Sequence, residues 1–328
     1  MAKRVKKVVK RASASVKLPR VGSGELLTLL DFVRYAVSRF AEADLVFAHG
    51  TTDPVAEAAF LICESLHLHP DQFESFANAR VTAAEGKKIL DLITRRVVTQ
   101  MPAAYLVNKV YMRGLPFYVD ERTIVPRSFI GELLDQHFSG GGDEDAGGSL
   151  IDDPLAIESV LDLCTGSGCL AILASQSFPN AQIDAVDISK GALEVASLNV
   201  SAYGLEDWVS LYRGDLFAPL KGKRYDLIIS NPPYVDAEGM AALPREYRHE
   251  PALALDGGAD GLQLIRRILA EAPAHLTAKS GLLCEIGRGK TPLEAEFPLP
   301  FLWLDTEGSS GEVFWLEAEN FRPISLRI

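Results

Sequence analysis

From residue 155 onward the chain repeats one pattern, a short apolar strand followed by a segment with helical periodicity. The predicted strands are IESVLDL, QIDAVDI, VSLYRG, YDLIIS, GLLCEIG, FLWLDT and EVFWLEA, with helices over 169–177, 190–203 and 260–272. Continuous apolar strands with helical crossovers form parallel sheets that helices cover on both faces. Only EGSSG joins the last two strands, so these should pair antiparallel at the sheet edge. We predict an α/β fold, a Rossmann-like doubly wound seven-stranded sheet.

The preceding part of the chain has helical periodicity. Apolar residues recur at three- and four-residue spacing over 26–37, Asp53-Pro54 is typical of a helix start, and Thr82 with Glu85 forms a capping-box pattern. Residues 105–125 switch to aromatic and β-branched types around a Gly-Leu-Pro turn, which indicates a two-stranded hairpin. We predict a small helical domain over 24–104, a linking β-hairpin over 105–127 and the α/β domain over 128–328.

The charge of the chain is unevenly distributed. Residues 1–20 hold eight of the 33 Lys and Arg residues and no acid, so the remainder carries a net charge of −19, against −11 for the whole chain. We predict that residues 1–23 form a basic, disordered tail. Two further interpretations are a weak contact with RNA or the ribosome and a cleaved organelle transit peptide.

Composition and cysteine usage narrow the class of protein. Hydrophobic residues make up 48% of the chain and charged residues 23%, as in globular proteins, and no apolar run approaches a membrane span of roughly 18–20 residues. The four scattered cysteines favour a reducing, cytoplasmic location. Cys63, His67 and His69 lack further ligands, so no metal site is predicted. We expect no membrane partner, and a flexible loop at the Gly- and Asp-rich residues 139–154.

A glycine-rich turn follows the first strand of the α/β region. Residues 160–168 read VLDLCTGSG, and Gly166 and Gly168 permit close approach of a ligand to backbone N–H groups at the start of a helix. Asp187 ends the second strand, where its carboxylate can accept both hydroxyl hydrogens of a ribose. The same pattern satisfies the dinucleotide fingerprint. The turn therefore predicts a nucleoside-bearing ligand without identifying it.

Two further acids near this turn have two interpretations each. Asp162 either holds the glycine turn or binds an amine of the ligand. Asp215, followed by Leu216, comes after the third strand, where it either accepts from the exocyclic amine of an adenine base or forms part of a turn.

Residues 229–236, ISNPPYVD, come at the end of the fourth strand, at the carboxyl edge of the sheet where ligands bind. Proline has a fixed φ and no N–H, so the backbone carbonyls here are rigid, free acceptors. Asn231 adds an amide oxygen and Tyr234 an aromatic ring. Acceptors that grip both hydrogens of a planar –NH₂ group orient its lone pair for attack. The electrophile implied is the sulfonium methyl of S-adenosylmethionine, because hydride transfer has no use for such a clamp.

Together, LDLCTGSGCLAI, VDIS and ISNPPYVD resemble class I S-adenosylmethionine-dependent methyltransferases with an Asn-Pro-Pro-Tyr motif. The chain is most similar to the protein glutamine N-methyltransferases of the HemK type, and the likeness extends to PAAYL, VPR and HEPALALDGGADGL. Release-factor methyltransferases usually continue the Pro-Arg with a Pro-x-Thr-Glu-like segment. This chain has SFIGE there, which resembles the branch that acts on ribosomal protein L-three of the large subunit. The resemblance implies N5-methylation of a glutamine, with S-adenosylhomocysteine as product, and substrate recognition by the helical domain.

The resemblance also assigns roles to residues. It implies that the residues lining the methionine part of the cofactor are Thr165, Gly166 and Gly168, that Asp187 binds the ribose, and that Asp215 and Leu216 flank the adenine. It further implies that Asn231 and the Pro232 backbone hold the glutamine amide, with Pro233 and Tyr234 beside it. Arg127 either shapes this pocket or forms a structural salt bridge.

Three other functions compete with this interpretation. A nucleic-acid amino methyltransferase for adenine, cytosine or guanine would use the same loop, but a body of charge −19 disfavours a long phosphate contact. A nicotinamide-dependent oxidoreductase rests on the glycine turn alone. A non-catalytic binding module would be expected to lack Asn231 or the glycines, and both are present. Within the favoured chemistry, peptide chain release factors are the alternative substrate.

Overall fold

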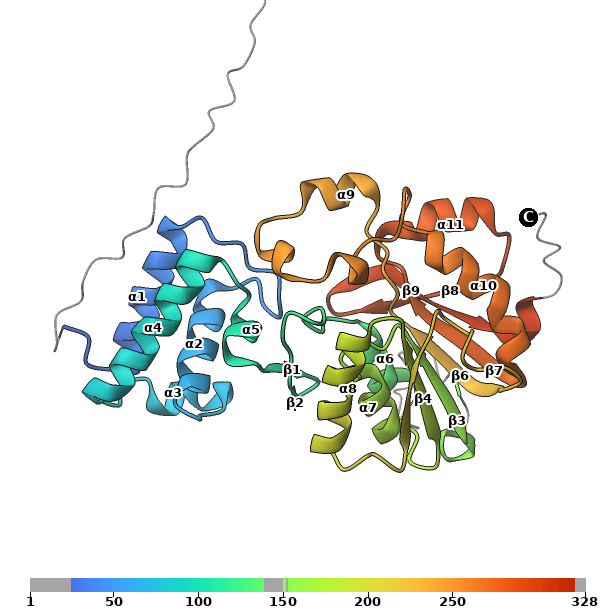
Figure 1. Cartoon of the computed structure of the whole chain (residues 1–328), viewed down its shortest axis with the longest axis horizontal. Helices are drawn as coiled ribbons and strands as arrows, with labels where there is room; N and C mark the ends of the chain where they lie inside the picture. Colours follow the sequence, from blue (N-terminus) through green and yellow to red (C-terminus); the bar gives the residue numbers. More distant parts are fainter. Residues whose placement is uncertain (1–24, 139–149, 152, 322–328) are drawn as a thin grey trace, which may run out of the picture. The chain divides into compact units, whose positions relative to one another are not determined.

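The computed structural model describes residues 25–138, 150–151 and 153–321 (Figure 1). The tail predicted at 1–23 and most of the predicted loop at 139–154 lie outside these residues. The chain divides into two compact units, Met1–Val107 and Asn108–Ile328. This division falls three residues beyond the predicted end of the helical domain and groups the hairpin with the larger unit. The roles of the domains stay predictions.

The first unit is helical. Its elements are α1 (Leu29–Glu42), α2 (Pro54–Ser65), η1 (Pro70–Gln72), α3 (Phe73–Phe76), α4 (Ala83–Thr99) and α5 (Ala103–Val107). The start signals in the sequence act as expected: Asp53 caps α2 by accepting from the Val55 N–H at 2.8 Å, and Thr82 and Glu85 form the capping box of α4. The apolar faces of these helices form one buried core, which includes Phe32, Phe40, Ile62, Ile89 and Ile93.

A buried ion pair crosses this core. The Arg96 side chain is fully buried, and its Nε donates to Glu57 Oε1 at 2.8 Å. A guanidinium nitrogen of Arg96 also donates to the Val46 carbonyl at 3.2 Å. Both charges have left water, so each depends on the other for its stabilisation.

In the second unit, β1 (Val110–Met112) and β2 (Leu115–Phe117) pair antiparallel. The main sheet has seven strands in the order β5-β4-β3-β6-β7-β9-β8, which confirms the predicted doubly wound fold. Strands β3 to β7 run parallel and β9 pairs antiparallel with both neighbours. Their bounds are β3 (Ser159–Leu163), β4 (Gln182–Asp187), β5 (Val209–Arg213), β6 (Tyr225–Ser230), β7 (Leu276–Glu285), β8 (Leu302–Thr306) and β9 (Ser309–Glu317).

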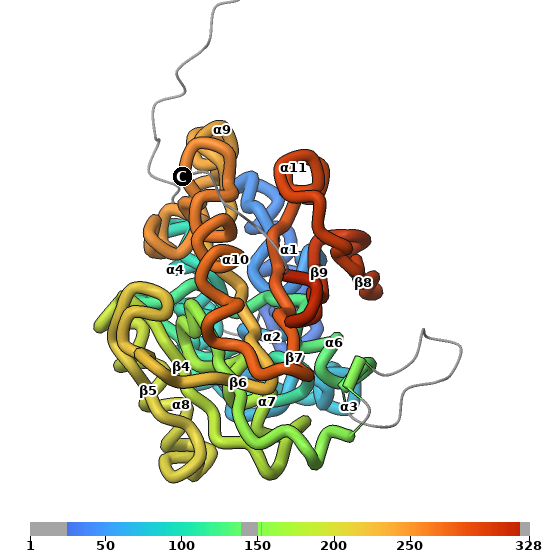
Figure 2. The backbone as a smooth tube through the Cα atoms, turned by 90° about the vertical axis from the view of Figure 1, so that its right-hand side faces the viewer, coloured from blue at the N-terminus to red at the C-terminus, as the bar shows by residue number. Residues whose placement is uncertain are grey.

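Helices cover both faces of this sheet (Figures 1 and 2). One face packs against α6 (Ile130–His137), α7 (Cys169–Ser177) and α8 (Lys190–Ala202). The other face packs against α10 (Gln263–His275) and α11 (Lys290–Glu296) through a core that includes Ile228, Ile268, Leu282 and Leu293. The short helix α9 (Ala237–Ala242) follows the Asn-Pro-Pro-Tyr segment.

Several boundaries differ from the prediction. Residues 105–107, predicted to begin the linking hairpin, belong to α5, and β7 begins at Leu276 rather than at residue 281. Helix α10 begins at Gln263 rather than at residue 260, because Gly261 has a φ of +78°, which a right-handed helix excludes. Strand β9 begins at Ser309, so the turn between β8 and β9 contains only Glu307 and Gly308.

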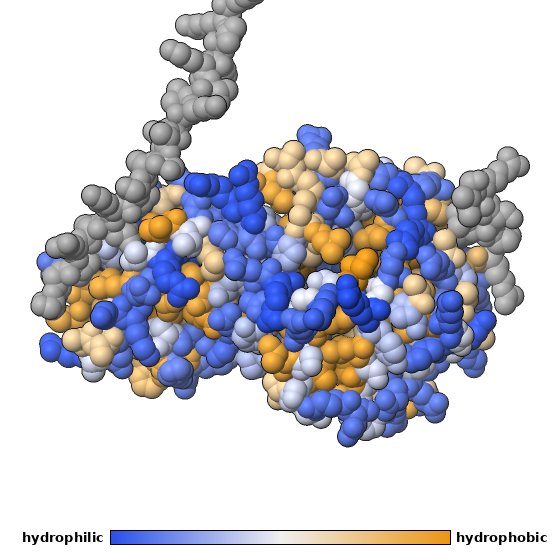
Figure 3. Space-filling model, viewed as in Figure 1, coloured by the Kyte–Doolittle hydropathy of each residue, from blue (hydrophilic) through white to orange (hydrophobic). Residues whose placement is uncertain are grey.

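Within the described ranges, no helix is both long and apolar enough to cross a membrane. On the face that Figure 3 shows, hydrophobic residues form separate areas among hydrophilic ones.

The Glu57–Arg96 pair gives a test of the first unit. Replacing Glu57 with Ala leaves the Arg96 charge buried, and removing one partner of such a pair typically costs about 3–5 kcal/mol. We expect Glu57→Ala to accelerate amide hydrogen exchange in α1, α2 and α4. All three tryptophans, Trp208, Trp303 and Trp315, belong to the second unit, so its tryptophan-detected unfolding should be unchanged. Wild-type exchange in α1, α2 and α4 would contradict a stabilising role for the pair.

Candidate active site

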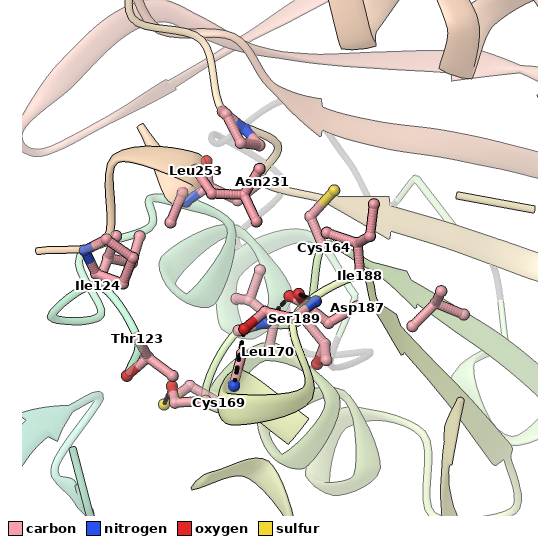
Figure 4. A pocket seen from close by; sticks show the side chains of 18 of the residues that line it. Thr123, Ile124, Cys164, Cys169, Leu170, Asp187, Ile188, Ser189, Asn231 and Leu253 are labelled. Atoms are coloured by element: carbon pink, nitrogen blue, oxygen red, sulfur yellow. Dashed lines mark hydrogen bonds between the residues drawn. The ribbon is translucent and has the colours of Figure 1, made fainter. Parts of the chain in front are cut away.

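A cavity of about 250 Å³ opens at the carboxyl ends of β3, β4, β5 and β6. Figure 4 shows Asn231, Cys164 and Asp187 around it. One wall comes from the segment 123–129, called the strap below, and another from the glycine turn after β3. The strap residues that line the cavity are Thr123, Ile124, Pro126, Arg127 and Ser128. Of the residues predicted from the sequence, those that line the cavity are Arg127, Thr165, Gly166, Asp187, Asp215, Leu216, Asn231 and Pro233. Those outside its lining are Asp162, Gly168, Pro232 and Tyr234.

The glycine turn has the backbone that its residues permit. Gly166 and Gly168 have φ values of +57° and +80°, in the left-handed region that glycine adopts without a Cβ penalty. A Cβ on Gly166 would meet no atom within 4 Å, so a ligand can approach the backbone there. A Cβ on Gly168 would lie 3.2 Å from the Ala196 Cβ, so this glycine serves the packing of α8 against the turn.

Asp162 fixes the glycine turn through hydrogen bonds. It is fully buried, and its Oδ2 accepts from the Thr165 hydroxyl at 2.5 Å and from the Ala171 N–H at 3.1 Å. Its Oδ1 is buried without a hydrogen-bond partner among the described residues. Burial raises the pKa of this carboxyl to about 7, because the ionised form loses its hydration. The loop-holding interpretation of Asp162 therefore has direct geometric support.

Asp187 also fixes the glycine turn through a hydrogen bond, and it lines the cavity. Its Oδ2 accepts from the Gly166 N–H at 2.9 Å, and its Oδ1 accepts from the Ser189 N–H at 2.8 Å. Burial raises the pKa of this carboxyl. Each oxygen keeps one further lone pair, so the carboxylate can still accept from two hydroxyl groups of a ligand.

Asp215 lies opposite a basic side chain that the sequence did not indicate. Its two oxygens are each 3.0 Å from a guanidinium nitrogen of Arg267, which projects from α10 and also lines the cavity. The pair is half-exposed, so it serves to orient the carboxylate more than to stabilise the fold. Leu216 is buried beside it.

Asn231 follows directly after β6. Its side chain makes no hydrogen bond to any other described residue, so both its amide oxygen and its amide nitrogen can serve a ligand. The preceding residue fixes the end of the strand, because the Ser230 hydroxyl donates to the Leu163 carbonyl of β3 at 3.0 Å. Asn231 and the glycine turn therefore face the same cavity from neighbouring strands.

Tyr234 is held from outside the cavity. Its hydroxyl donates to Glu285 Oε1 at 2.8 Å, at the end of β7. A Cβ on Gly287 would lie 2.7 Å from two adjacent carbon atoms of the ring, so one side of the ring packs closely against this glycine. Burial raises the pKa of the Tyr234 hydroxyl well above its ordinary value.

Both sequence interpretations of Arg127 have support. The residue lines the cavity, and its two terminal nitrogens donate to the Glu250 carboxylate at 2.6 and 2.8 Å. Its guanidinium also lies 5.3 Å from the centre of the Tyr247 ring. The same Glu250 accepts from the Val125 N–H at 2.8 Å, so one buried carboxylate fixes two points of the strap.

Glu285, Arg267 and Arg122 had no sequence prediction. The sequence held a signal only for Glu285, which lies near the carboxyl end of the predicted strand GLLCEIG, at the sheet edge where ligands bind. Within the described part of the chain, no group of three or more His, Cys, Asp or Glu side chains could hold a metal ion.

Comparison with known proteins gives consistent matches. The family described as methyltransferase small domain matches residues 139–244. The ribosomal protein uL3 glutamine methyltransferase of Bradyrhizobium diazoefficiens is 71% identical over 318 residues, which cover 97% of this chain and 99% of that protein. The protein of the same name from Bordetella pertussis is 51% identical over 90% of this chain and 97% of its own length. Among solved structures, a methyltransferase from Pyrococcus furiosus is 18% identical, with a TM-score of 0.38, over 49% of this chain and 75% of that one.

The pKa of Asp162 gives a test of this site. The pKa of Asp162 is about 7 in the folded protein, above its ordinary value of 3.8. Between about pH 4 and 7 this carboxyl is therefore protonated in the folded protein and ionised in the unfolded chain. The contribution of Asp162 to stability therefore falls as pH rises through this window, by at most about 1.4 kcal/mol per pH unit, and is level above it. Asp162→Asn removes this dependence.

Urea unfolding, followed by tryptophan fluorescence between pH 4 and 8, measures the effect in the second unit. We expect the wild type to lose stability relative to Asp162→Asn as pH rises to 7. Parallel profiles for the two proteins would show that Asp162 is ionised throughout.

Proposed function

The chain belongs to the family of ribosomal protein uL3 glutamine methyltransferases, and we propose that it methylates the side-chain amide nitrogen of a glutamine in the large-subunit ribosomal protein uL3. This membership confirms the resemblance to the L-three branch and sets aside the oxidoreductase and the non-catalytic binding module. We further propose that the enzyme acts in the cytoplasm, where ribosomal proteins are made.

One observation carries the chemistry: Asn231, with no side-chain hydrogen bond to another described residue, faces the cavity that the glycine turn and Asp187 also line. An amide nitrogen is a poor nucleophile because its lone pair is delocalised. The Asn231 Oδ1 and the Pro232 carbonyl would accept its two hydrogens, which turns the lone pair toward the cavity. Proline cannot relax this arrangement, because its φ is fixed. The acceptors would accelerate methyl transfer by positioning the nucleophile and by presenting dipoles that are already oriented.

The cavity fits S-adenosylmethionine by its donor set. The open space over Gly166 admits a ligand to the backbone, and the Asp187 carboxylate retains accepting positions for ribose hydroxyls. We assign the methionine part to Thr165 and Gly166, and the adenine to Asp215 and Leu216. Gly168, which the resemblance also assigned to the methionine part, lies outside the cavity lining and packs against Ala196. S-adenosylmethionine supplies a methyl group on a sulfonium sulfur and leaves as S-adenosylhomocysteine.

Methyl transfer to an amide nitrogen requires the removal of one proton, and only after the nitrogen has been methylated. The glutamine nitrogen gains a methyl group and loses one proton. No histidine is among the described cavity-lining residues, and the two carboxylates there, Asp187 and Asp215, already accept from backbone N–H groups and from Arg267 respectively. We propose that the proton passes to water once the nitrogen carries the methyl group, and that Asn231 and Pro232 stabilise the positive charge until then.

Substrate recognition is proposed for the helical domain. The basic tail is proposed to add a weak contact with RNA or the ribosome. Release factors and nucleic-acid amino groups stay the alternative acceptors, and the experiment below separates them.

Replacing Asn231 with Ala tests the proposal. The purified enzyme is incubated with S-adenosylmethionine carrying a tritiated methyl group and, separately, with uL3, a release factor or ribosomal RNA. We expect label in uL3 alone, and a kcat lower by about 10²–10³-fold for Asn231→Ala, because one preorganised hydrogen-bonding group is lost. Asn180→Ala, outside the cavity lining, is the matched control and should retain activity. Label in the release factor alone would keep the chemistry and change the substrate, whereas label in RNA alone would overturn the proposal.

A second variant tests the cofactor assignment. Gly166→Ala places a side chain in the left-handed region, at about 1–2 kcal/mol, and points its Cβ into open space where the ligand would lie. Gly204→Ala is a matched control, since Gly204 has a φ of +65°, equally open space and a position outside the cavity.

Both variants should lose similar stability. Only Gly166→Ala should weaken the binding of S-adenosylhomocysteine, by about tenfold or more in calorimetry, equivalent to at least about 1.4 kcal/mol. Equal affinities for the two variants would exclude the proposed approach of the cofactor to Gly166.

A further inference from the structure

Glu285 is a buried acid that no step above uses. It ends β7, and 1% of its surface is exposed. Its Oε1 accepts from the Tyr234 hydroxyl at 2.8 Å. Its Oε2 accepts from the Ser128 hydroxyl at 2.7 Å and from the Phe129 N–H at 2.9 Å. Three donors thus converge on one carboxylate, which is an acceptor-only group when ionised.

The donors come from two walls of the cavity. Tyr234 belongs to the Asn-Pro-Pro-Tyr segment, three residues after Asn231, whereas Ser128 and Phe129 end the strap. These donors are 105 or more residues from Tyr234 in the sequence, and no hydrogen bond joins the segment directly to the strap among the described residues. Glu285 therefore joins the two walls by hydrogen bonds.

The rest of the Tyr234 environment allows little freedom. A Cβ on Gly257 would lie 2.7 Å from the Tyr234 Cα, and one on Gly261 would lie 2.5 Å from the Tyr234 carbonyl oxygen. The next residue is also tied, since the Val235 N–H donates to the Leu255 carbonyl at 2.9 Å. Together with Gly287 against the ring, three glycines therefore contact Tyr234 so closely that none of them leaves room for a side chain. A small displacement of Tyr234 would be passed along the proline pair to Asn231.

The opposite end of the strap is fixed independently. Glu250 accepts from the Val125 N–H and from Arg127. Glu285 fixes the end at Ser128 and Phe129. Pro126, which lies between the two anchored ends, lines the cavity together with the anchored Arg127 and Ser128. Burial raises the pKa of the Glu285 carboxyl, so the protein bears a cost to keep an acid at this place.

We propose that Glu285 is a positioning residue for methyl transfer: through Tyr234 and the strap it fixes the separation of the two cavity walls between which the substrate glutamine is held. This inference rests on the proposed function. It does not place Glu285 in contact with substrate or cofactor, because Glu285 is not among the residues that line the cavity.

Glu285→Gln tests the proposal with little change in volume. The amide offers one oxygen with two accepting positions and a donor nitrogen, so it cannot accept from all three donors. We expect a kcat on uL3 lower by about 10–100-fold, as for a displacement of reacting groups by up to about 1 Å. The KM for S-adenosylmethionine should be unchanged, since the cofactor residues are on β3, β4 and β5.

A double-mutant cycle with Tyr234→Phe separates positioning from general loss of stability. Phe keeps the ring and removes only the hydroxyl that binds Glu285. If Glu285 acts through this bond, the double variant should be no slower than Glu285→Gln alone. Additive losses, or a wild-type kcat in Glu285→Gln, would overturn the proposal.

Asp226→Asn is the matched control. Asp226 is on the adjacent strand β6 but at the amino end of the sheet, and it accepts from the Ser159 N–H and hydroxyl and from the Thr277 hydroxyl at 2.8–3.1 Å. This variant removes a comparable hydrogen-bonded acid far from the cavity. It should lower the melting temperature and leave kcat unchanged.

Hydrogen exchange supplies a measurement that needs no substrate. Glu285→Gln should accelerate exchange in residues 125–130 and 234–236, and Asp226→Asn should not. Accelerated exchange in an enzyme that is inactive on uL3 would keep the positioning role and reject the proposed function. Unchanged exchange in both segments would reject the positioning role whatever the substrate.

Discussion

The parallel pairing of β3 with β4 and β6 is the constraint on which the site depends. In this register Leu163 pairs with Val186 on one side and with Ser230 on the other, so all three strands end at one level. Asp187 is the last residue of β4, and the glycine turn and Asn231 follow directly after β3 and β6. A shift of one residue would turn the apolar side chains of a strand to the opposite face of the sheet, which helices cover on both sides, and it would separate Asn231 from the turn. The Ser230 hydroxyl bond to the Leu163 carbonyl reinforces this alignment where the strands stop pairing.

Buried carboxylates fix the loops that follow these strands and form the walls of the cavity. Asp162 and Asp187 hold the glycine turn, and Glu250 and Glu285 hold the strap. Burial raises the pKa of Asp162, Asp187 and Glu285, so each works against the stability of the fold near neutral pH. An apolar residue could fill the same volume at lower cost, but it could not accept hydrogen bonds from loop backbone and thereby specify one loop conformation. Active sites that depend on precise positioning commonly contain such groups, which lower the stability of the fold.

The sequence predicts the local parts of this arrangement and not the tethers. The strands and α7, at 169–177 as predicted, follow from continuous apolar runs bounded by glycine, and the caps at Asp53 and Thr82 are set within three residues. By contrast, Arg127 and Glu250 are 123 residues apart and Tyr234 and Glu285 are 51 apart. Spacing carries no information about such pairs, since only the packed fold brings them together. Tyr234 shows the same limit. The sequence predicts its ring beside the bound amide, whereas the residue lies outside the cavity lining and its hydroxyl donates to the buried Glu285.

The charges of the cavity bear on the choice of substrate. Of the described residues, three arginines line it, and each is paired with acids: Arg122 with Asp120 and Glu194, Arg127 with Glu250, and Arg267 with Asp215. A site that binds a nucleic-acid backbone needs cations to replace the counterions of its phosphates. Guanidinium groups already neutralised by neighbouring carboxylates attract phosphate weakly, and the acidic body of the chain repels it. A side-chain amide is uncharged and can be bound by fixed acceptors, the role that we propose for Asn231 and Pro232. The electrostatics of the walls therefore favour a glutamine over a flipped base, independently of the family to which the chain belongs.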